Sequence, residues 1–389
     1  MRSGSRKGAP DSFWKRGIVT TEERFMRMAI RLARRGVDLP SCEPLTGAVI
    51  VSEDRVVGSS YATHAAGRSV ITAALNQAGE LARGATLYSN IWPRCDRADE
   101  EELVRRLVES RLARVFVGVK ESTQDSREGN GILSKLIARR IEVNTGVCER
   151  DCRRVNEKYY KYSATGLPFV TVAFAQSLDG RIATRTGDSQ WISSPPARRF
   201  AHELRREHDV VMVGIGTVLA DDPQLTVRLV NGRNPLRIVV DSRLRIPLTS
   251  RALDHGAASH TLVVAGRDAD AARIKAITNM GASVLQLEES PGHRGVDLLR
   301  LLRELGQRGI GSVLAEGGKG IITSLIASDC VDRIATVIAP KLIGDGIEAI
   351  GDLGITQLDD AIAFSSVQMR RLGPDIVFDG RLRPSGNLR

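Results

Sequence analysis

The chain alternates short apolar runs with amphipathic stretches of helical length, a pattern typical of helices packed on a mostly parallel sheet. In the first half, apolar positions at helical spacing predict helices over residues 22–36, 70–83, 100–110 and 132–140. The apolar runs between them predict strands at residues 48–51, 86–88, 115–119 and 141–143. We therefore expect an α/β domain in this half.

A basic helical stretch over residues 149–162 ends at Gly166-Leu-Pro168, where glycine and proline form a typical helix stop. Beyond it, apolar runs predict strands at residues 169–174, 210–213, 236–240, 261–264, 283–287, 312–315 and 334–339. Intervening amphipathic stretches predict helices at residues 197–207, 271–280, 296–307 and 320–327. A second α/β domain follows from this alternation.

The chain of 389 residues, 42% of them hydrophobic, is long enough to bury the cores of two domains. The pattern predicts a flexible polar tail over residues 1–20 and a first domain over 21–150. A linker helix is expected over 151–167 and a second domain over 168–389. The tail is also compatible with an organellar transit peptide.

The net charge of +10 comes from arginines scattered along the chain, without lysine runs or interleaved aromatic residues. A nucleic-acid footprint should gather on one face, so this scatter argues against nucleic-acid binding and suits phosphorylated small substrates. The cysteine count of five is odd and no apolar signal segment is present, which favours reduced thiols in the cytoplasm. No run reaches the ~18 apolar residues of a membrane helix.

The densest chemistry lies between residues 173 and 228, where small residues alternate with polar groups and two arginines, Arg205 and Arg228. We interpret this stretch as an active site. The run Glu316-Gly-Gly-Lys-Gly320 joins a predicted strand to a predicted helix, where glycines let an anion approach the backbone; simple turn chemistry explains it equally well. Gly214-Ile-Gly216 lacks the third glycine of the dinucleotide fingerprint, which disfavours a standard Rossmann domain.

Six motifs occur in a fixed order across the second half. They are Ala175-Gln-Ser-Leu-Asp-Gly180, Ser189-Gln-Trp-Ile-Ser193, the run from Gly216 to Arg228, Asp241-Ser242, Glu316-Gly-Gly318 and Ala339-Pro-Lys-Leu342. Together they resemble the reductase domain of the bifunctional riboflavin-biosynthesis deaminase/reductase family. The resemblance implies a dihydrofolate-reductase-like fold, NADPH as cofactor, and reduction of the ribosyl chain of 5-amino-6-(5-phosphoribosylamino)uracil to a ribityl chain.

Carried over position by position, the resemblance assigns roles to individual residues. The substrate-binding positions are Ser189, Arg205, Leu225, Arg228 and Glu316. The NADPH-binding positions are Ala175, Trp191, Thr217, Asp221, Ser242 and Gly318, and the catalytic positions are Asp221 and Glu316. The two arginines suit a phosphate by charge and by the fork geometry of guanidinium. Hydride transfer needs no metal or protein nucleophile, since the cofactor carries the chemistry.

Each of these residues also has a purely structural interpretation. Arg205 lies in a helical pattern and could be a solvated arginine, and Trp191 could belong to the core. The Asp221-Asp222-Pro223 run could be a turn or a cap, and Glu316 a surface acid. The ordered motifs favour the functional interpretation in each case.

The first half resembles the cytidine-deaminase-like three-layer domain of the same family through residues 44–51 and 78–88. Zinc deaminases bind the metal through His-x-Glu and two cysteines, and the glutamate moves protons. Here Ser69 stands at the histidine position and Ile71 at the glutamate position. Arg94 stands at the first cysteine position, with Cys95 displaced by one residue. No zinc and no deamination are therefore expected.

Other residues of this half offer little to rebuild a metal site. His64 and Cys95 are the nearby candidates, and two ligands do not make a tetrahedral site. Glu43 replaces a substrate-contacting amide of the family, and Cys148 and Cys152 share a helical face in a structural role. The domain keeps its apolar strands, so we expect a scaffold that packs on the reductase or mediates oligomerisation.

The leading hypothesis is a reductase of riboflavin biosynthesis that depends on a separate upstream deaminase and forms a homodimer. One alternative is a reductase redirected to another ribosylated or pterin-like compound. The other is a catalytically silent binding or regulatory protein, against which the retention of every reductase position argues.

Overall fold

The computed structural model describes residues 19–63, 70–92, 97–119, 132–254, 258–289 and 295–383. The chain folds as two compact units. The first takes the chain up to Gly36 and then Leu45–Val155, and the second takes Val37–Pro44 and everything from Asn156 onward. The short segment 37–44, which the sequence pattern assigns to the first domain, thus belongs to the second unit.

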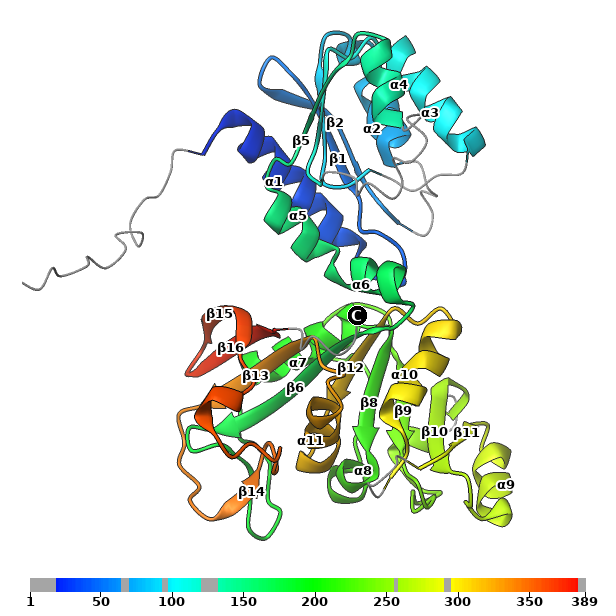
Figure 1. Ribbon diagram of the computed structural model, residues 1–389, viewed down its shortest axis with the longest axis vertical. Helices are drawn as coiled ribbons and strands as arrows, with labels where there is room; N and C mark the ends of the chain where they lie inside the picture. The colour runs from blue at the N-terminus through cyan, green and yellow to red at the C-terminus, as the bar shows by residue number, and fades with distance from the viewer. Residues whose placement is uncertain are drawn as a thin grey trace, which may run out of the picture. The chain divides into compact units, whose positions relative to one another are not determined.

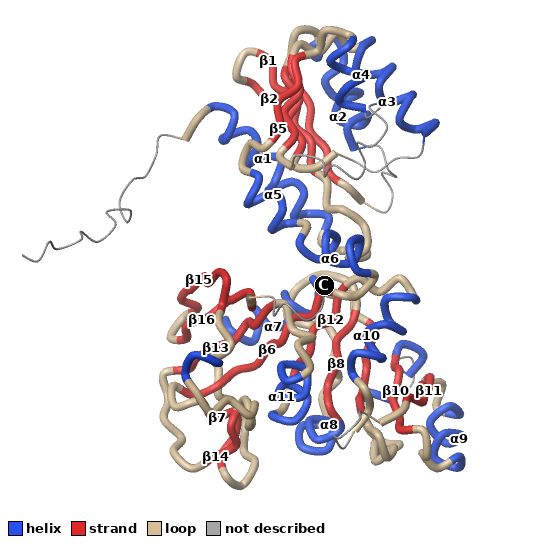
Figure 2. The backbone as a smooth tube through the Cα atoms, in the orientation of Figure 1, coloured by secondary structure: helices blue, strands red, loops and turns tan. Residues whose placement is uncertain are grey.

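The first unit is built on a five-stranded sheet with the order β2-β1-β3-β4-β5. Its strands are β1 (Gly47–Ser52), β2 (Arg55–Tyr61), β3 (Thr86–Ser89), β4 (Arg114–Val117) and β5 (Glu142–Thr145). Its helices are α1 (Thr21–Ala33), α2 (Val70–Ala78), α3 (Arg97–Glu109), α4 (Ile132–Ala138) and α5 (Glu149–Val155). Helices α2, α3 and α4 cover one face and α1 and α5 the other, so the unit has three layers (Figures 1 and 2).

Helix α1 shows why these layers form. Its buried residues recur at helical spacing and make one apolar face: Phe25, Met26, Ala29, Ile30 and Ala33. The Thr20 side chain caps the helix by accepting the backbone N–H of Glu23 at 3.2 Å. Strand β1 packs closely against this helix. Gly47 allows the close approach, since a Cβ at that position would lie only 2.2 Å from the Ala29 carbonyl oxygen.

The second unit contains a nine-stranded sheet with the order β11-β10-β9-β8-β12-β6-β13-β16-β15. The parallel strands are β6 (Phe169–Ser177), β8 (Val210–Gly214), β9 (Leu236–Val240), β10 (Thr261–Gly266), β11 (Ser283–Leu287), β12 (Ser312–Glu316) and β13 (Arg333–Ala339). The antiparallel hairpin of β15 (Phe364–Leu372) and β16 (Asp375–Leu382) extends one edge. Separately, β7 (Arg181–Thr184) pairs with β14 (Gly346–Glu348).

Helices bury both faces of this sheet (Figure 1). Helices α7 (Pro195–Glu207), α8 (Ile215–Asp221) and α9 (Ala271–Asn279) pack on one apolar core. Helices α10 (Leu298–Gln307) and α11 (Lys319–Ala327) pack on a second core on the opposite face. The parallel strands are apolar at successive positions because both of their faces are covered.

The predicted elements of both α/β patterns are present, with two kinds of difference. The helix predicted over residues 149–162, and with it the linker helix over 151–167, is interrupted at Asn156 (φ −108°, ψ 18°). It becomes α5 and α6 (Glu157–Thr165), which belong to different units. The sequence pattern did not predict β2, β7, β14, β15, β16 or the short α8. Within the described residues no helix is long and apolar enough to span a bilayer.

The segment 37–44 is fastened to the amino end of the large sheet. The Asp209 carboxylate accepts the backbone N–H of Ser41 at 3.1 Å and that of Ser312 at 3.0 Å, and pairs with Arg233 at 2.6 Å. Arg206 makes a bidentate pair with Asp38 at 2.9 and 2.8 Å. These contacts hold the segment at the amino ends of the strands, whereas the predicted site residues lie at their carboxyl ends.

Candidate active site

A cavity of about 830 Å³ lies at the carboxyl ends of β6, β8 and β12. Strand β12 lies between β6 and β8, although it comes last of the three in the chain. In open α/β sheets ligands bind at the carboxyl ends of strands, near such changes of strand order. The walls come from these strand ends, from α7 and α8, from the loop after α8 and from β7.

One face of α7 forms a wall of the cavity. Arg198, Ala201, His202 and Arg205 all line it, and their spacing of three and four residues places them on one side of the helix. The helix start is fixed in place, because the backbone N–H and hydroxyl of Ser194 donate to the Asp375 carboxylate at 2.8 and 2.6 Å. The wall is therefore a rigid element.

Arg205 and Glu316 form a buried bidentate ion pair across this wall. Arg205 Nε donates to Glu316 Oε1 at 2.8 Å and Nη2 to Oε2 at 2.6 Å, while Nη1 donates to the Thr226 carbonyl at 3.1 Å. Their side chains are 13% and 14% exposed. Burial opposes the charge of Arg205, but the Glu316 carboxylate outweighs it and raises the pKa of Arg205. Neither residue is thus a solvated surface group.

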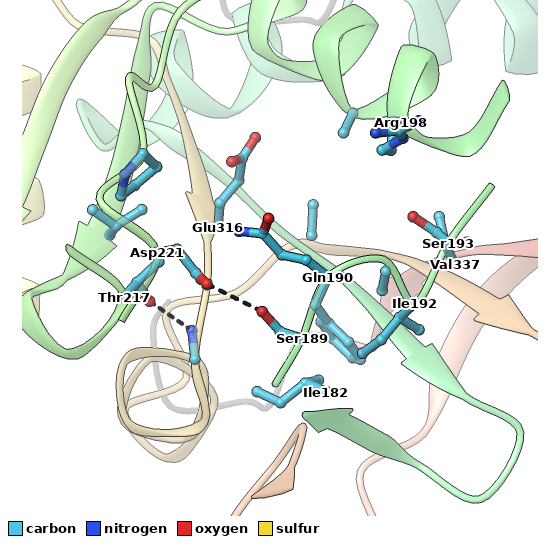
Figure 3. Close-up of a pocket in the computed structure, with 18 of the residues that line it drawn as sticks. Ile182, Ser189, Gln190, Ile192, Ser193, Arg198, Thr217, Asp221, Glu316 and Val337 are labelled. Atoms are coloured by element: carbon cyan, nitrogen blue, oxygen red, sulfur yellow. Dashed lines mark hydrogen bonds between the residues drawn. The ribbon is translucent and has the colours of Figure 1, made fainter. Parts of the chain in front are cut away.

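Helix α8 brings two polar contacts to the cavity (Figure 3). The Ser189 hydroxyl donates to Asp221 Oδ1 at 3.1 Å. Thr217 Oγ1 accepts the backbone N–H of Gly318 at 3.1 Å, which joins α8 to the glycine turn before α11. Ser189 and Asp221, although 32 residues apart in sequence, lie together on one side of the cavity.

The glycine turn after β12 is shaped for a group that approaches its backbone. Gly317 has φ +122°, and a Cβ there would lie 2.5 Å from Thr217 Oγ1. Apart from adjacent residues and the backbone of their own helices, no described heavy atom lies within 4 Å of the position that a Cβ of Gly216 or Gly320 would take. Helix α11 begins here, and the free N–H groups of a helix start favour an anion. The turn could therefore hold a phosphate group of a cofactor.

The loop after α8 presents Arg228 to the cavity through a contact with His202. The backbone N–H of Arg228 donates to His202 Nδ1 at 3.0 Å, so this ring nitrogen carries no proton and the neutral ring carries its proton on Nε2. Burial, with the charges of Arg205 and Arg228, lowers the pKa of His202 to about 4. Leu225 anchors the loop as a fully buried side chain.

Trp191 forms part of the open side of the cavity. Its side chain is 60% exposed, so it is not a core residue. The Arg198 guanidinium lies 4.2 Å from the centre of the indole ring, a cation–π distance, and Lys341 Nζ donates to the Trp191 carbonyl at 2.6 Å. Trp191 thus offers an exposed aromatic face beside the cavity.

Comparison with known proteins identifies the family. A sequence family described as the RibD C-terminal domain matches residues 168–378. The riboflavin biosynthesis protein RibD of Aquifex aeolicus is 35% identical over 361 residues, 92% of this chain and 98% of that protein. The RibD of Escherichia coli is 31% identical over 370 residues, 91% and 98% of the two chains. The chain belongs to the RibD family.

Solved RibD structures share the fold of this chain. Acinetobacter baumannii RibD superposes with a TM-score of 0.77 at 28% identity, covering 93% of this chain and 99% of that one. A Thermotoga maritima protein described as a diaminohydroxyphosphoribosylaminopyrimidine deaminase and 5-amino-6-(5-phosphoribosylamino)uracil reductase gives 0.75 at 27% identity, with the same coverage. The expected fold class, a deaminase-like domain followed by a dihydrofolate-reductase-like domain, is thereby confirmed. So is the expected membership of the family.

The structure brings together the site residues that the sequence motifs assigned in this RibD-family chain, with one exception. Those lining the cavity are Ala175, Ser189, Trp191, Arg205, Thr217, Asp221, Leu225, Arg228, Glu316 and Gly318. Ser242 lies outside the lining; it follows β9, where its carbonyl accepts the Gly266 N–H at 2.9 Å. The expectation that both arginines are free to bind a phosphate changes, because Glu316 already fills the guanidinium fork of Arg205.

Sequence reasoning missed three basic residues that line the cavity: Arg198, His202 and Arg251. The first two share the helical face of Arg205, at seven and three residues before it, so the helix period alone could have found them. Arg251 had no such signal, because it comes from a separate turn after β9. A side chain brought in by a distant turn cannot be inferred from local spacing.

Ser69 and Arg94, two positions that diverge from the deaminase motifs, lie outside the described residues, as do the candidate ligands His64 and Cys95. Ile71 is described, and it lies fully buried in the apolar core beside α2. Among described residues no group of three His, Cys, Asp or Glu side chains is arranged to hold a metal ion. Cys148 and Cys152 are free thiols, the second buried against the Gly118 backbone.

Proposed function

We propose that this chain is an NADPH-dependent 5-amino-6-(5-phosphoribosylamino)uracil reductase that no longer deaminates. The reductase assignment rests on membership of the RibD family and on one observation above all: Arg205 and residues of four of the six motifs line a single cavity of about 830 Å³. Relics of an abandoned site would have no reason to keep this convergence.

NADPH, when bound, supplies the hydride that reduces the ribosyl carbon. The turn at Gly317 and Gly318 fits its pyrophosphate, because these two residues carry no side chains and lead into the amino end of α11. Thr217 fixes that turn by accepting the Gly318 N–H. Trp191 supplies an aromatic face at the cavity mouth, and Ser242 would reach only a part of the cofactor that extends past β9.

The substrate end of the cavity contains Arg228, Leu225 and the Arg205–Glu316 pair. Arg228 keeps its charge without a carboxylate partner among the described residues, so it suits the phosphate of the substrate. Arg205 and Glu316 neutralise each other and act together as a polar wall, which can offer hydrogen bonds to the sugar or the pyrimidine. Their rigid pairing holds the substrate carbon at a fixed place relative to the cofactor.

Reduction of the ribosyl chain also needs a proton on the sugar oxygen released from the reacting carbon. The Ser189 hydroxyl is hydrogen-bonded to Asp221, and the Asp221 side chain is exposed to solvent. A protonated Asp221, supplied from solvent, would reverse this hydrogen bond by donating to Ser189 Oγ, while Ser189 passes its own proton to that oxygen. Asp221 and Ser189 provide the acid of the reaction in this scheme.

The deaminase half of the proposal rests on side-chain chemistry. An isoleucine at position 71 cannot shuttle protons, and its burial in an apolar core leaves no room for a polar replacement. Ser69 and Arg94 replace two zinc ligands of the family motif. A separate deaminase would then supply the substrate, while the first domain acts as a scaffold.

Two further properties belong to the proposal. The free thiols, among them Cys42 and the buried Cys152 and Cys330, suit a reducing compartment, so the protein would act in the cytoplasm. The protein would act as a homodimer. Its domains would keep the expected limits of residues 21–150 and 168–389, except that the segment 37–44 belongs to the second unit.

The test offers purified full-length protein NADPH together with either the aminated pyrimidine or its deaminated product. We expect NADPH oxidation with the deaminated compound alone, and no ammonia release from the aminated one. Ammonia release would overturn the loss of deamination. Absence of NADPH oxidation with both compounds would overturn the reductase assignment and favour a silent binding protein, whereas oxidation with only a pterin would favour a redirected reductase.

A further inference from the structure

Three of the four arginines that line the cavity have no carboxylate partner among the described residues. Arg198 lies over the Trp191 ring, 4.2 Å from its centre, which leaves Arg228 and Arg251 as the two whose charge meets neither an acid nor an aromatic ring there. Arg228 Nη1 donates to the Thr226 hydroxyl at 2.7 Å, the one hydrogen bond that its side chain makes with the described residues. The side chain of Arg251 has no ion pair or hydrogen bond within the described part of the chain, although it lines the same cavity. Arg205 provides the contrast, since Glu316 occupies its guanidinium fork.

Asp222 holds Arg251 at the cavity. Asp222 ends α8 in a left-handed conformation (φ 38°, ψ 59°), directly after the cavity residue Asp221. Its Oδ1 accepts the Arg251 backbone N–H at 2.9 Å and the Ser250 hydroxyl at 2.9 Å. One carboxylate oxygen thus fastens the turn that carries Arg251 to the end of α8, while the Arg251 side chain remains uncommitted.

His202 holds Arg228 in the same manner. The His202 ring accepts the Arg228 backbone N–H at 3.0 Å, so the main chain of Arg228 is fixed to α7. Since the ring is neutral, it adds no third positive charge to this part of the cavity. Both arginines therefore have a fixed backbone and a guanidinium without a carboxylate partner among the described residues.

Arg228 and Arg251 line the same cavity, and their like charges repel each other. Burial is the main cause that lowers the pKa of Arg228, and the charges of Arg205 and Arg251 lower it further. With Arg205 already compensated by Glu316, the remaining repulsion is between Arg228 and Arg251. A dianion between them would relieve this repulsion and could accept hydrogen bonds from both forks.

We propose that Arg251 and Arg228 together bind the terminal phosphate monoester of the substrate, with Asp222 and His202 as positioning residues. The identity of the substrate rests on the proposed function, but the phosphate site itself does not. The cofactor could present a phosphate monoester too. The sugar phosphate is preferred because the glycine turn at Gly317, which suits cofactor phosphates, is a separate element of the cavity.

Binding of ribose 5-phosphate and of ribose to the full-length protein, measured by calorimetry, tests the site without turnover. The variants are Arg251→Gln and, as a matched control, Arg303→Gln, which removes the same charge from an exposed position of α10 outside the cavity lining. We expect Arg251→Gln to weaken ribose 5-phosphate binding by about 10-fold or more, the effect of losing one charge-assisted contact. Arg303→Gln should bind as the wild type does, and Arg251→Lys should recover part of the loss.

Three results would overturn the site: no preference of the wild type for ribose 5-phosphate over ribose, an Arg251→Gln affinity within twofold of wild type, or an equal loss in Arg303→Gln. A loss of NADPH affinity with unchanged ribose 5-phosphate affinity would assign Arg251 to the cofactor and overturn the substrate assignment. Failure of the proposed function gives a different pattern, in which ribose 5-phosphate binding depends on Arg251 while the pyrimidine is not reduced.

Discussion

The buried pair of Arg205 and Glu316 should behave as a clamp whose two halves depend on each other. Replacing Glu316 by leucine leaves a guanidinium that is 13% exposed with two of its three hydrogen bonds lost, those at 2.8 and 2.6 Å. Removing one partner of a buried pair strands a charge, which costs about 3–5 kcal/mol of unfolding free energy. Replacing Arg205 by methionine strands the carboxylate and should cost a similar amount.

The double variant Arg205→Met/Glu316→Leu separates a clamp from two independent contacts. With both charges removed and apolar groups of similar size in their place, no charge is stranded, so the double variant should be more stable than either single one. The coupling free energy, from denaturant unfolding of the four proteins, should exceed ~2 kcal/mol. Because the units can unfold separately, hydrogen exchange of peptides containing β12 should accompany the denaturation curves.

Additive losses in the double variant would refute the clamp. So would a cost below ~1 kcal/mol for Glu316→Leu, the value of an exposed pair. Ligand binding gives a second check. A clamp predicts that both single variants weaken ribose 5-phosphate binding alike, whereas a direct phosphate ligand at position 205 predicts a loss only when the arginine is replaced.

Three more predictions follow from neighbouring contacts. The unfolding free energy should fall as the pH drops from about 6.5 to 4.5, because His202 (pKa about 4) and buried His208 stay neutral in the folded state but take up protons when unfolded. In denaturation measurements across this pH range, His208→Asn should make the fall smaller. A wild-type unfolding free energy that does not change with pH would contradict the prediction. Asp209→Asn should lower the unfolding free energy by about 2–4 kcal/mol, because its carboxylate joins Ser41 and Arg233 to the sheet; an unchanged midpoint in urea would argue against that joint. Asp221→Asn should lower kcat by about 100-fold or more with little change in KM for NADPH, as expected for loss of an acid; unchanged steady-state kcat would remove Asp221 from the reaction.

Much of the fold could be predicted because burial on both faces leaves a plain signal. Strands such as β8 and β10 are apolar at successive positions, since helices cover both faces of the sheet. Strand β15 gave no signal, because its residues at the sheet edge are mostly exposed and no apolar alternation develops. The seven-residue α8 was too short for its period to be recognised.

The sequence predicted which residues form the site, but it did not predict which of them contact one another. Ordered motifs identified Arg205 and Glu316, but no local rule pairs residues 111 positions apart. The place of the 37–44 segment in the second unit was missed for the same reason, because Asp38 and its partner Arg206 are 168 positions apart in sequence. Tertiary packing decides which charged groups pair at such separations. The sequence therefore shows which charged groups a site contains, but not which of them are already paired.

The segment 37–44 also limits what a fragment of the second unit can show. A fragment of residues 165–389 would lose Ser41 and its hydrogen bond to Asp209, as well as α6, whose Lys161 pairs with Asp332 at 2.6 Å. Weak expression or activity of such a fragment would therefore reflect lost packing within the second unit. A scaffold role of the first domain is better tested with substitutions in the full chain.

The central claim is that this cavity transfers a hydride from NADPH to the ribosyl carbon of the pyrimidine. The most direct measurement is mass spectrometry of the product formed by the full-length protein from 5-amino-6-(5-phosphoribosylamino)uracil and NADPH deuterated at the transferring position. The account predicts one deuterium in the ribityl chain of the product. A product without deuterium, or recovery of unreduced substrate, would contradict it.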